Sequence, residues 1–494
     1  MSFNSLQYAI FLPVVFLAYH YCRDSIRWLV LLAASLVFYS ALRAPQLLLA
    51  LIIVILLNYF LGIRIGTCTF QKRRHAILWA GIAANVLVLA IIRYFPFIAR
   101  NLDPFIGTLL NGMSIHTSEI VVSIGVSYFV FQAISYLVDI YLEIGKPERH
   151  IGYFALSIAF FPKLLQGPIE RSEILISQLR RAYVFEYENV RAGILLFAWG
   201  LFMKVVLADR LALFADEVFN NPHSYAGVSL MVGIYAYAFQ VFFDFCGYTN
   251  MALGTARIFN IRLTRNFDSP YLSTSVAEFW RRWHISFSRW ILDYIFRPLQ
   301  MKWRGWGSAG TASALLITFF VSGVWHGASG GFIVWGGLHG VFLASAVYWK
   351  PYKEKLYRKF RIAKGPMLTA WQVGITFHLV CASWIFFRSR TISDSLYVIG
   401  HLFSPPTTET LSQHDYIVKV LLVNQSWREA AVIVLALAAM GMASILRHRH
   451  KVPEFGDFIL DKPCWFRWGL YAGLGTAVLV FGVFSIPSFI YYRF

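Results

Sequence analysis

About twelve apolar runs constrain what this chain can fold into. They lie at residues 6–21, 28–42, 46–66, 76–96, 119–143, 190–208, 227–248, 309–328, 331–349, 368–388, 428–446 and 466–486. A helix needs about 20 apolar residues to cross the hydrocarbon of a bilayer, and most of these runs reach or approach that length. A helix also bonds its backbone polar groups internally, as lipid requires. The sequence therefore predicts an all-α membrane protein with ten or more crossings.

The composition agrees with a membrane-embedded chain. Hydrophobic residues make up 58% of the 494 residues and charged residues 14%, whereas a soluble domain has about 25% charged residues. So many spans leave little chain for a separate soluble domain. We therefore expect one membrane domain over residues 1–494. The first residues carry no basic stretch and no cleavage site, so we expect a retained first helix rather than a signal peptide.

The formal charge of +19 reflects topology and lipid headgroups rather than nucleic acid, because Lys and Arg occur in short clusters between apolar runs. The clusters lie at residues 72–74, 180–181, 281–304, 350–364 and 447–451. The predicted runs place an even number of crossings between successive clusters, so all five can face the cytoplasm. Counting outward from them puts both termini on the opposite face.

Three segments depart from simple spanning. Residues 151–169 are apolar but short and interrupted by prolines, which favours a re-entrant or interfacial element. Residues 277–296 alternate aromatic and charged side chains at helical spacing, which predicts one amphipathic helix in the interface or beside a polar cavity. An ordinary amphipathic anchor would give the same pattern. Residues 389–427 have mixed polarity and are expected to form a non-cytoplasmic loop with short helices.

Two histidines in one predicted hairpin are the strongest chemical signal. His326 and His339 lie in otherwise apolar spans, on either side of Gly330 and Gly331. An ionisable side chain at membrane depth is costly and by default a candidate functional site. The imidazole pKa of about 6.5 suits it to accept and return a proton near neutral pH. A hydrogen-bonded structural histidine is the alternative for each.

Signatures of other enzyme classes are missing from the sequence. There is no GxxxxGK[ST], GxGxxG, HExxH or GxSxG, and the five cysteines lie far apart without a CxxC pair. We therefore predict no metal site, no disulfide framework and no bound cofactor. Membrane-buried chemistry centred on histidine remains.

The WHG motif around His326, followed by the second histidine His339, resembles the signature of the membrane-bound O-acyltransferase superfamily. Further blocks are similar to the branch of membrane subunits that acetylate alginate: FPKLLQGPIER (161–171), FDFCGYTNMALG (243–254), NFDSPYLSTSVAEFWRRWHISFSRWILDYIFRPL (266–299) and FIYYRF (489–494). The resemblance implies a helical bundle around a central funnel.

The same resemblance implies where the chemistry lies. The family's catalytic histidine corresponds to His326, and a further family histidine corresponds to His284, which is a second catalytic candidate with a helix-packing hydrogen bond as its alternative. Other candidate positions along a substrate channel are His339, Trp325, Arg282, Arg289 and Asp244. Where relatives carry an aspartate in GYSDMAIG, this chain has Asn250, so no charge-dependent role is expected there. Asp244 is expected to pair with an Arg or a backbone donor, with a structural role favoured over a catalytic one.

Phe489, Tyr491 and Phe494 resemble a terminal motif of cell-surface acylation systems, in which the tyrosine is thought to accept the acyl group transiently. An aromatic belt at the membrane interface would explain the same residues.

The resemblance implies acetyl transfer from a cytoplasmic donor, acetyl-CoA, to a polysaccharide outside the cytoplasm, such as an alginate-like exopolysaccharide, cellulose or peptidoglycan. It implies a multi-pass protein of the bacterial inner membrane and a periplasmic or membrane-tethered partner that resembles SGNH hydrolases. D-alanyl transfer to teichoic acid is the alternative within the superfamily. A transporter is the alternative outside it.

Overall fold

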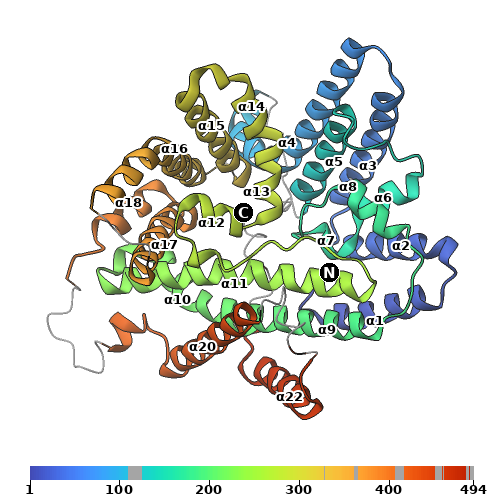
Figure 1. Cartoon of the computed structure of the whole chain (residues 1–494). Helices are drawn as coiled ribbons and strands as arrows, with labels where there is room; N and C mark the ends of the chain where they lie inside the picture. The colour runs from blue at the N-terminus through green and yellow to red at the C-terminus, as the bar shows by residue number, and fades with distance from the viewer. Residues whose placement is uncertain are drawn as a thin grey trace. The chain divides into compact units, whose positions relative to one another are not determined.

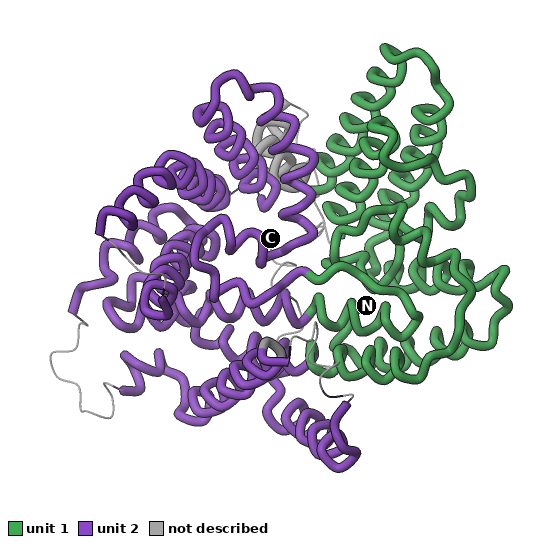
Figure 2. The backbone as a smooth tube through the Cα atoms, in the orientation of Figure 1, with its two compact units in different colours: residues 1–200, 248–265, 487–494 green, residues 201–247, 266–486 purple. Residues whose placement is uncertain are grey.

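The computed structural model describes residues 1–109, 125–327, 329–360, 365–405, 417–450, 459, 461–484 and 489. Over these residues the regular secondary structure is helical, without a β-strand (Figure 1). The chain divides into two compact units: unit 1 is 1–200, 248–265 and 487–494, and unit 2 is 201–247 and 266–486 (Figure 2). The expectation of one membrane domain stays a prediction.

Nine helices in the described part of the chain are long and apolar enough to cross a membrane. They are Pro45–Thr67, Gln71–Arg93, Tyr187–Asn220, Val228–Ile258, Arg304–His326, Gly330–Lys359, Pro366–Arg388, Trp427–Leu446 and Cys464–Phe481. Two shorter apolar helices, α1 (Leu6–Tyr21) and α5 (Val126–Tyr141), and the 14-residue α2 (Arg27–Ser40) cover the other predicted runs. The predicted all-α, polytopic architecture is confirmed.

Unit 1 packs its helices around buried polar pairs as well as apolar side chains. Its elements are α1, η1 (Asp24–Ile26), α2, α3 (Pro45–Thr67), α4 (Gln71–Leu109), α5, α6 (Ile151–Ala159), α7 (Phe161–Leu164), α8 (Ser172–Leu179), most of α9 (Tyr187–Phe202) and the end of α11 (Val228–Ile258). Asn58 of α3 and Asn85 of α4 are fully buried and exchange two hydrogen bonds of 2.9 and 2.8 Å between their side-chain amides. Each amide thereby avoids being left unbonded among apolar groups, which is costly.

The predicted interruption at residues 151–169 is confirmed. The chain forms two short helices, α6 and α7, that are separated at Phe160. Every residue from 156 to 170 is buried within the protein. At about 1.5 Å per residue, helices of this length cannot cross a bilayer.

Unit 2 contains the hairpin that the sequence singled out. Its elements are η2 (Met203–Ala208), α10 (Asp209–Asn220), η3 (Pro222–Ser224), most of α11, η4 (Pro270–Leu272), α12 (Val276–Arg282), α13 (Ile285–Ile291), η5 (Leu292–Phe296), α14 (Arg297–Lys302), η6 (Arg304–Trp306), α15 (Gly307–His326), α16 (Gly330–Lys359), α17 (Pro366–Arg388), α18 (Ile392–Gly400), η7 (Ile417–Leu421), α20 (Trp427–Arg449) and α22 (Cys464–Phe481). The short helices α18 and η7 agree with the expectation for residues 389–427, of which 406–416 lie outside the described residues.

The prediction of one amphipathic helix over residues 277–296 is wrong. The chain forms α12 and α13 with a break at Trp283 and His284, and continues as the π-helical turn η5. The aromatic side chains Phe279, Trp283 and Phe287 of this stretch are buried, and the polar Ser286 between them is buried too. The break arises because a neighbouring segment bonds the first backbone groups of α13, which side-chain periodicity does not report.

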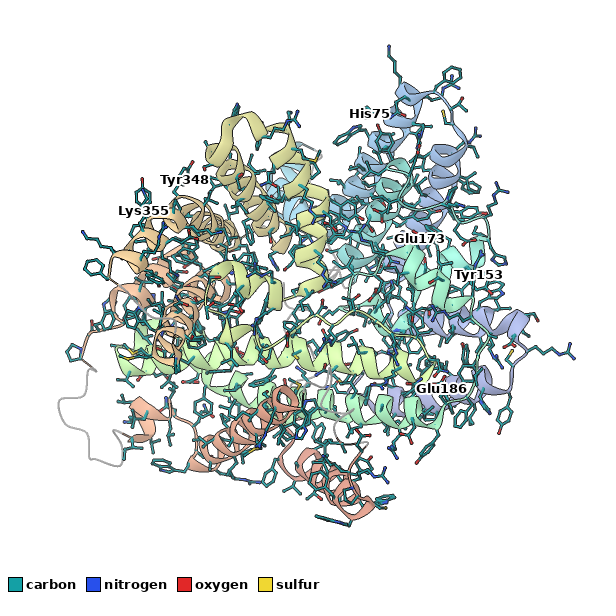
Figure 3. The ribbon with its side chains drawn as sticks, viewed as in Figure 1. His75, Tyr153, Glu173, Glu186, Tyr348 and Lys355 are labelled. Carbon is teal, nitrogen blue, oxygen red and sulfur yellow. The ribbon has the colours of Figure 1, made fainter. Side chains whose placement is uncertain are left out.

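The topology prediction can be tested at α16. Tyr348 and Lys355 lie at the surface of unit 2 near the end of this helix (Figure 3). In a cysteine-free background, we expect Leu356→Cys to be labelled by an impermeant thiol reagent only from the cytoplasmic side, because the basic cluster 350–364 stays there. The matched control is Leu396→Cys in α18, also an exposed leucine, which we expect to react only from the opposite side. Labelling of position 356 from outside would contradict the predicted orientation.

Candidate active site

Close packing of α15 against α16 positions His326 and His339. A Cβ on Gly336 would lie 2.4 Å from the carbonyl oxygen of Phe319, and one on Gly323 would lie 2.5 Å from that of Phe332. Both positions therefore need glycine, since real Cβ contacts are never so short. Small residues of this kind let membrane helices approach at the backbone. Gly331 likewise approaches the carbonyl oxygen of Phe386 on α17, as expected for the glycine-rich flank.

His326 ends α15 inside a box of aromatic rings. It is the last helical residue and 5% exposed. Ring centroids lie 4.8 Å away for Trp335 of α16, 5.0 Å for Phe387 of α17 and 4.4 Å for its neighbour Trp325. Three helices thus surround this imidazole with apolar walls. Such walls limit the access of water to the ring.

His284 occupies the break between α12 and α13. Its backbone is left-handed, with φ 42° and ψ 55°, a conformation that is costly for residues other than glycine and needs support from the surroundings. The support is Asn266: its carbonyl accepts the N–H of Ile285 at 3.0 Å, and its side chain accepts the N–H of Ser286 at 3.1 Å. Asn266, the first residue of the NFDSPY block, therefore stabilises the break between α12 and α13.

Phe287 brings His284 and His326 into one cluster. Its ring centroid lies 5.1 Å from that of His284 and 6.4 Å from that of His326. Burial lowers the pKa of His284 to about 3, so the ring is neutral at pH 7. His284 lies outside the nine candidate spans. His284 and His326, which are 42 residues apart in sequence, thus flank one aromatic ring.

His339 is held by hydrogen bonds on both ring nitrogens. Trp280 donates from Nε1 to Nδ1 at 3.2 Å, and the Ser383 hydroxyl lies 3.0 Å from Nε2. The side chain is fully buried, with its ring 5.1 Å from Trp335. These contacts join α12, α16 and α17. They support a packing role for His339 rather than a catalytic one.

The other candidates are spread over the surroundings of this cluster. Trp325 stacks on Phe287 at 4.4 Å and is half-buried. Arg282 pairs with Glu278 one turn earlier, at 2.6 Å. Arg289 is exposed. Trp325 therefore belongs to the cluster, whereas Arg282 stabilises α12.

Asp244 has a partner that the sequence prediction missed. The expected partner was an Arg or a backbone donor, but the carboxylate accepts from Lys204 at 2.6 Å. Lys204 also pairs with Asp209 at 2.7 Å, and all three side chains are at most 3% exposed. A lysine within the predicted span 190–208 was the signal that could have found this cluster, because an ionisable residue in a span needs a partner.

Tyr491 lies outside the described residues. Near it in sequence, Phe489 is fully buried in unit 1, with its ring 4.9 Å from Tyr248. Among the residues that were described, no group of three or more His, Cys, Asp or Glu side chains could hold a metal ion. The predictions on Tyr491, on metals and on cofactors stay predictions.

Comparison with known proteins agrees with this constellation. The sequence profile of the membrane-bound O-acyltransferase family matches residues 151–387, a range that contains His284, His326 and His339. The chain is 33% identical to the peptidoglycan O-acetyltransferase of Helicobacter pylori, over 79% of this chain and 77% of that protein.

Two further relatives place the chain among bacterial acyltransferases. It is 33% identical to the probable alginate O-acetylase AlgI of Pseudomonas aeruginosa, over 80% of this chain and 73% of that protein. It is 26% identical to the teichoic acid D-alanyltransferase of Bacillus subtilis, over 68% and 82%. The nine apolar helices of the described residues, the two histidines of the α15–α16 hairpin and these relatives all indicate a membrane-embedded acyltransferase. The chain therefore belongs to the membrane-bound O-acyltransferase family, as a multi-pass O-acyltransferase of a bacterial membrane.

Proposed function

We propose that this protein takes acetyl groups from acetyl-CoA on the cytoplasmic side of the inner membrane and passes them on for O-acetylation of a polysaccharide outside the cytoplasm. Relatives whose names state O-acetylation are 33% identical over about 80% of the chain. The D-alanyltransferase is 26% identical over 68%. The comparison thus favours acetylation, and membership of an acyltransferase family argues against a transporter.

The observation that carries the proposal is the aromatic box around His326. As general base, the imidazole takes the proton of an attacking hydroxyl while that oxygen bonds to the thioester carbonyl carbon. The carbon–sulfur bond then breaks, and the proton passes to the departing thiolate. A dry surrounding suits this step, because water would compete with the acceptor hydroxyl for the thioester. Phe287, Trp335 and Phe387 supply it.

His284 has a supporting place in this proposal. A ring that is neutral at pH 7 can accept or donate a hydrogen bond without bringing a charge into the cluster. Its buried position against Phe245 and Phe287, at 4.7 and 5.1 Å, holds the imidazole on one side of Phe287. We propose that His284 lines the site and that His326 moves the proton.

The donor is tested by incubating the purified protein with acetyl-CoA and measuring free CoA thiol. We expect release from acetyl-CoA and none from a D-alanyl thioester on a carrier protein. Release only from the carrier would overturn the acetyl-CoA assignment in favour of D-alanyl transfer. The absence of release from both donors would overturn the proposed reaction.

Onward transfer involves Tyr491 in this proposal. The phenol attacks the acetyl thioester, and the tyrosyl ester then passes the acetyl group to a periplasmic or membrane-tethered partner that resembles SGNH hydrolases. A phenol of pKa about 10 forms an ester that is activated for onward transfer. The polysaccharide is the final acceptor.

Tyr491→Phe is expected to abolish polysaccharide acetylation, because it removes the accepting oxygen and keeps the ring. The adjacent Tyr492 offers a matched control, and Tyr492→Phe is expected to act as the wild type. The measurements are acetylated polysaccharide in cells and acetyl-tyrosine in the corresponding peptide by mass spectrometry. Normal acetylation with phenylalanine at 491 would leave this tyrosine as a residue of the aromatic belt.

A further inference from the structure

The π-helical turn η2 has one backbone carbonyl that accepts a hydrogen bond from outside the helix. In a regular α-helix the N–H of Asp209 would donate to the carbonyl of Val205, four residues earlier. Here it donates to the carbonyl of Lys204, five residues earlier. The Val205 carbonyl instead accepts the N–H of Val483 at 2.8 Å. π-helical turns are rare in proteins, and those that occur are often found at functional sites.

A second contact holds the same stretch of chain, residues 481–484, which we call the exit segment. Arg210 donates from Nη2 to the carbonyl oxygen of Phe481 at 2.5 Å. Its Nη1 pairs with Glu429 of α20, which fixes the guanidinium. The exit segment is therefore bound through two backbone groups, the carbonyl of Phe481 and the N–H of Val483. Backbone bonds fix the direction of the chain whatever side chains it carries.

The buried ionic cluster stabilises the turn that offers the carbonyl. Lys204 and Asp209 are five residues apart, so their ion pair of 2.7 Å spans the π turn. Asp244 of α11 holds the same ammonium at 2.6 Å. In a regular α-helix, successive side chains are rotated by about 100° around the helix axis. Residues 204 and 209 would then point to different sides of the helix, and the ion pair would separate. The cluster thus keeps the Val205 carbonyl available.

We propose that η2 and Arg210 form a docking site for the exit segment, and that docking of this segment is needed for acyl transfer through Tyr491. Arg210 is then a positioning residue for acyl transfer. The proposal rests on the proposed role of Tyr491 for its functional part. Its structural part rests on the contacts of Phe481 and Val483 alone. Beyond the exit segment, Phe489 is fully buried in unit 1.

A disulfide tests docking directly. Given the 2.8 Å bond and standard bond lengths, the Cα atoms of Val205 and Val483 are at most about 7 Å apart, which is near the reach of a disulfide. In a cysteine-free full-length protein, V205C/V483C should cross-link quickly on mild oxidation. Adding Arg210→Lys should slow cross-linking about tenfold, the worth of one charge-assisted hydrogen bond.

The control is Arg388→Lys, since Arg388 also pairs with a carboxylate of unit 2, Asp216, and is not part of the docking site. Cross-linking should proceed normally in this variant. Function is then measured as acetyl transfer to the polysaccharide. Transfer should fall in the reduced Arg210→Lys protein and recover once the disulfide has formed, a rescue that general damage to the fold would not allow.

Equal cross-linking with arginine or lysine at 210, or slow transfer that oxidation does not restore, would overturn the docking proposal. A failure of the proposed function looks different. In that case the cysteine pair with Arg210 intact would release no CoA from acetyl-CoA, whether or not it cross-links. Normal transfer by Tyr491→Phe with the expected cross-linking would refute the relay and leave the docking site in place.

Discussion

His326→Ala is expected to lower the rate of acetyl transfer by about 10²–10⁴-fold, the usual contribution of a general base. The imidazole centroid lies 4.8, 5.0 and 4.4 Å from those of Trp335, Phe387 and Trp325, whereas His339, which also contacts Trp335, has both ring nitrogens engaged in hydrogen bonds. Without it, the attacking hydroxyl keeps its proton while its oxygen bonds to the carbonyl carbon. The measurement is the initial rate of CoA release, with the thermal midpoint of the purified protein recorded alongside.

The matched control is His339→Gln, in the same hairpin. Because both nitrogens of His339 hold hydrogen bonds to Trp280 and Ser383, this change should lower thermal stability more than it lowers the rate. His326→Gln, which keeps a polar side chain, should be as slow as His326→Ala. A His326→Ala protein with a near-normal rate would refute the assignment. So would a loss of folded protein from both His326 variants, because it would reveal a structural role.

Lys204→Met is expected to destabilise the protein by about 3–5 kcal/mol, the usual cost of removing one partner from a buried ion pair. It would leave the carboxylates of Asp209 and Asp244 buried without their shared cation. The measurement is the thermal midpoint and the yield of folded protein in detergent. Adding Asp209→Asn and Asp244→Asn to Lys204→Met should recover much of the loss, because no uncompensated charge then remains.

Lys163→Met provides a comparison of similar burial. Lys163 is 4% exposed and donates to neutral groups, the side chain of Gln132 and the carbonyl of Ile158. Burial lowers its pKa to about 7, so it carries less charge near neutral pH. Its replacement should therefore cost less than that of Lys204. Equal losses in the two variants, or a stable Lys204→Met protein, would contradict the role given to the ionic cluster.

The spans and the histidine hairpin could be predicted because each is encoded locally. An apolar run is a helix in lipid whatever its neighbours are, and a histidine inside it is visible in the sequence. The break at His284 could not be predicted, because Asn266 creates it from another segment. The π register of η2 was missed for the same reason: the Lys204 pairs that accompany it include Asp244, 40 residues away.

Side-chain roles were predicted less well than positions. Asp244 was recognised as a buried charge that needs a partner, but Lys204, which pairs with it at 2.6 Å, was not predicted. His339 was a candidate position along a substrate channel, whereas its two hydrogen bonds support a packing role. Tyr491 depends on resemblance alone, and the structure adds to it only the anchoring of the exit segment.

The contact of α15 with α16 at Gly323 and Gly336 also limits how acyl selectivity can change. The two backbones already touch there, so the helices cannot move closer, and any Cβ at these positions would force them apart. Such a shift would displace His326 from Trp335. In the proposed reaction, room for a bulkier acyl chain beside His326 would therefore come from smaller rings at Phe287, Trp335 or Phe387 rather than from the spacing of the helices. Under that proposal, selectivity for acyl size is separated from the placement of His326, so that acyl selectivity can vary while the position of the imidazole stays fixed.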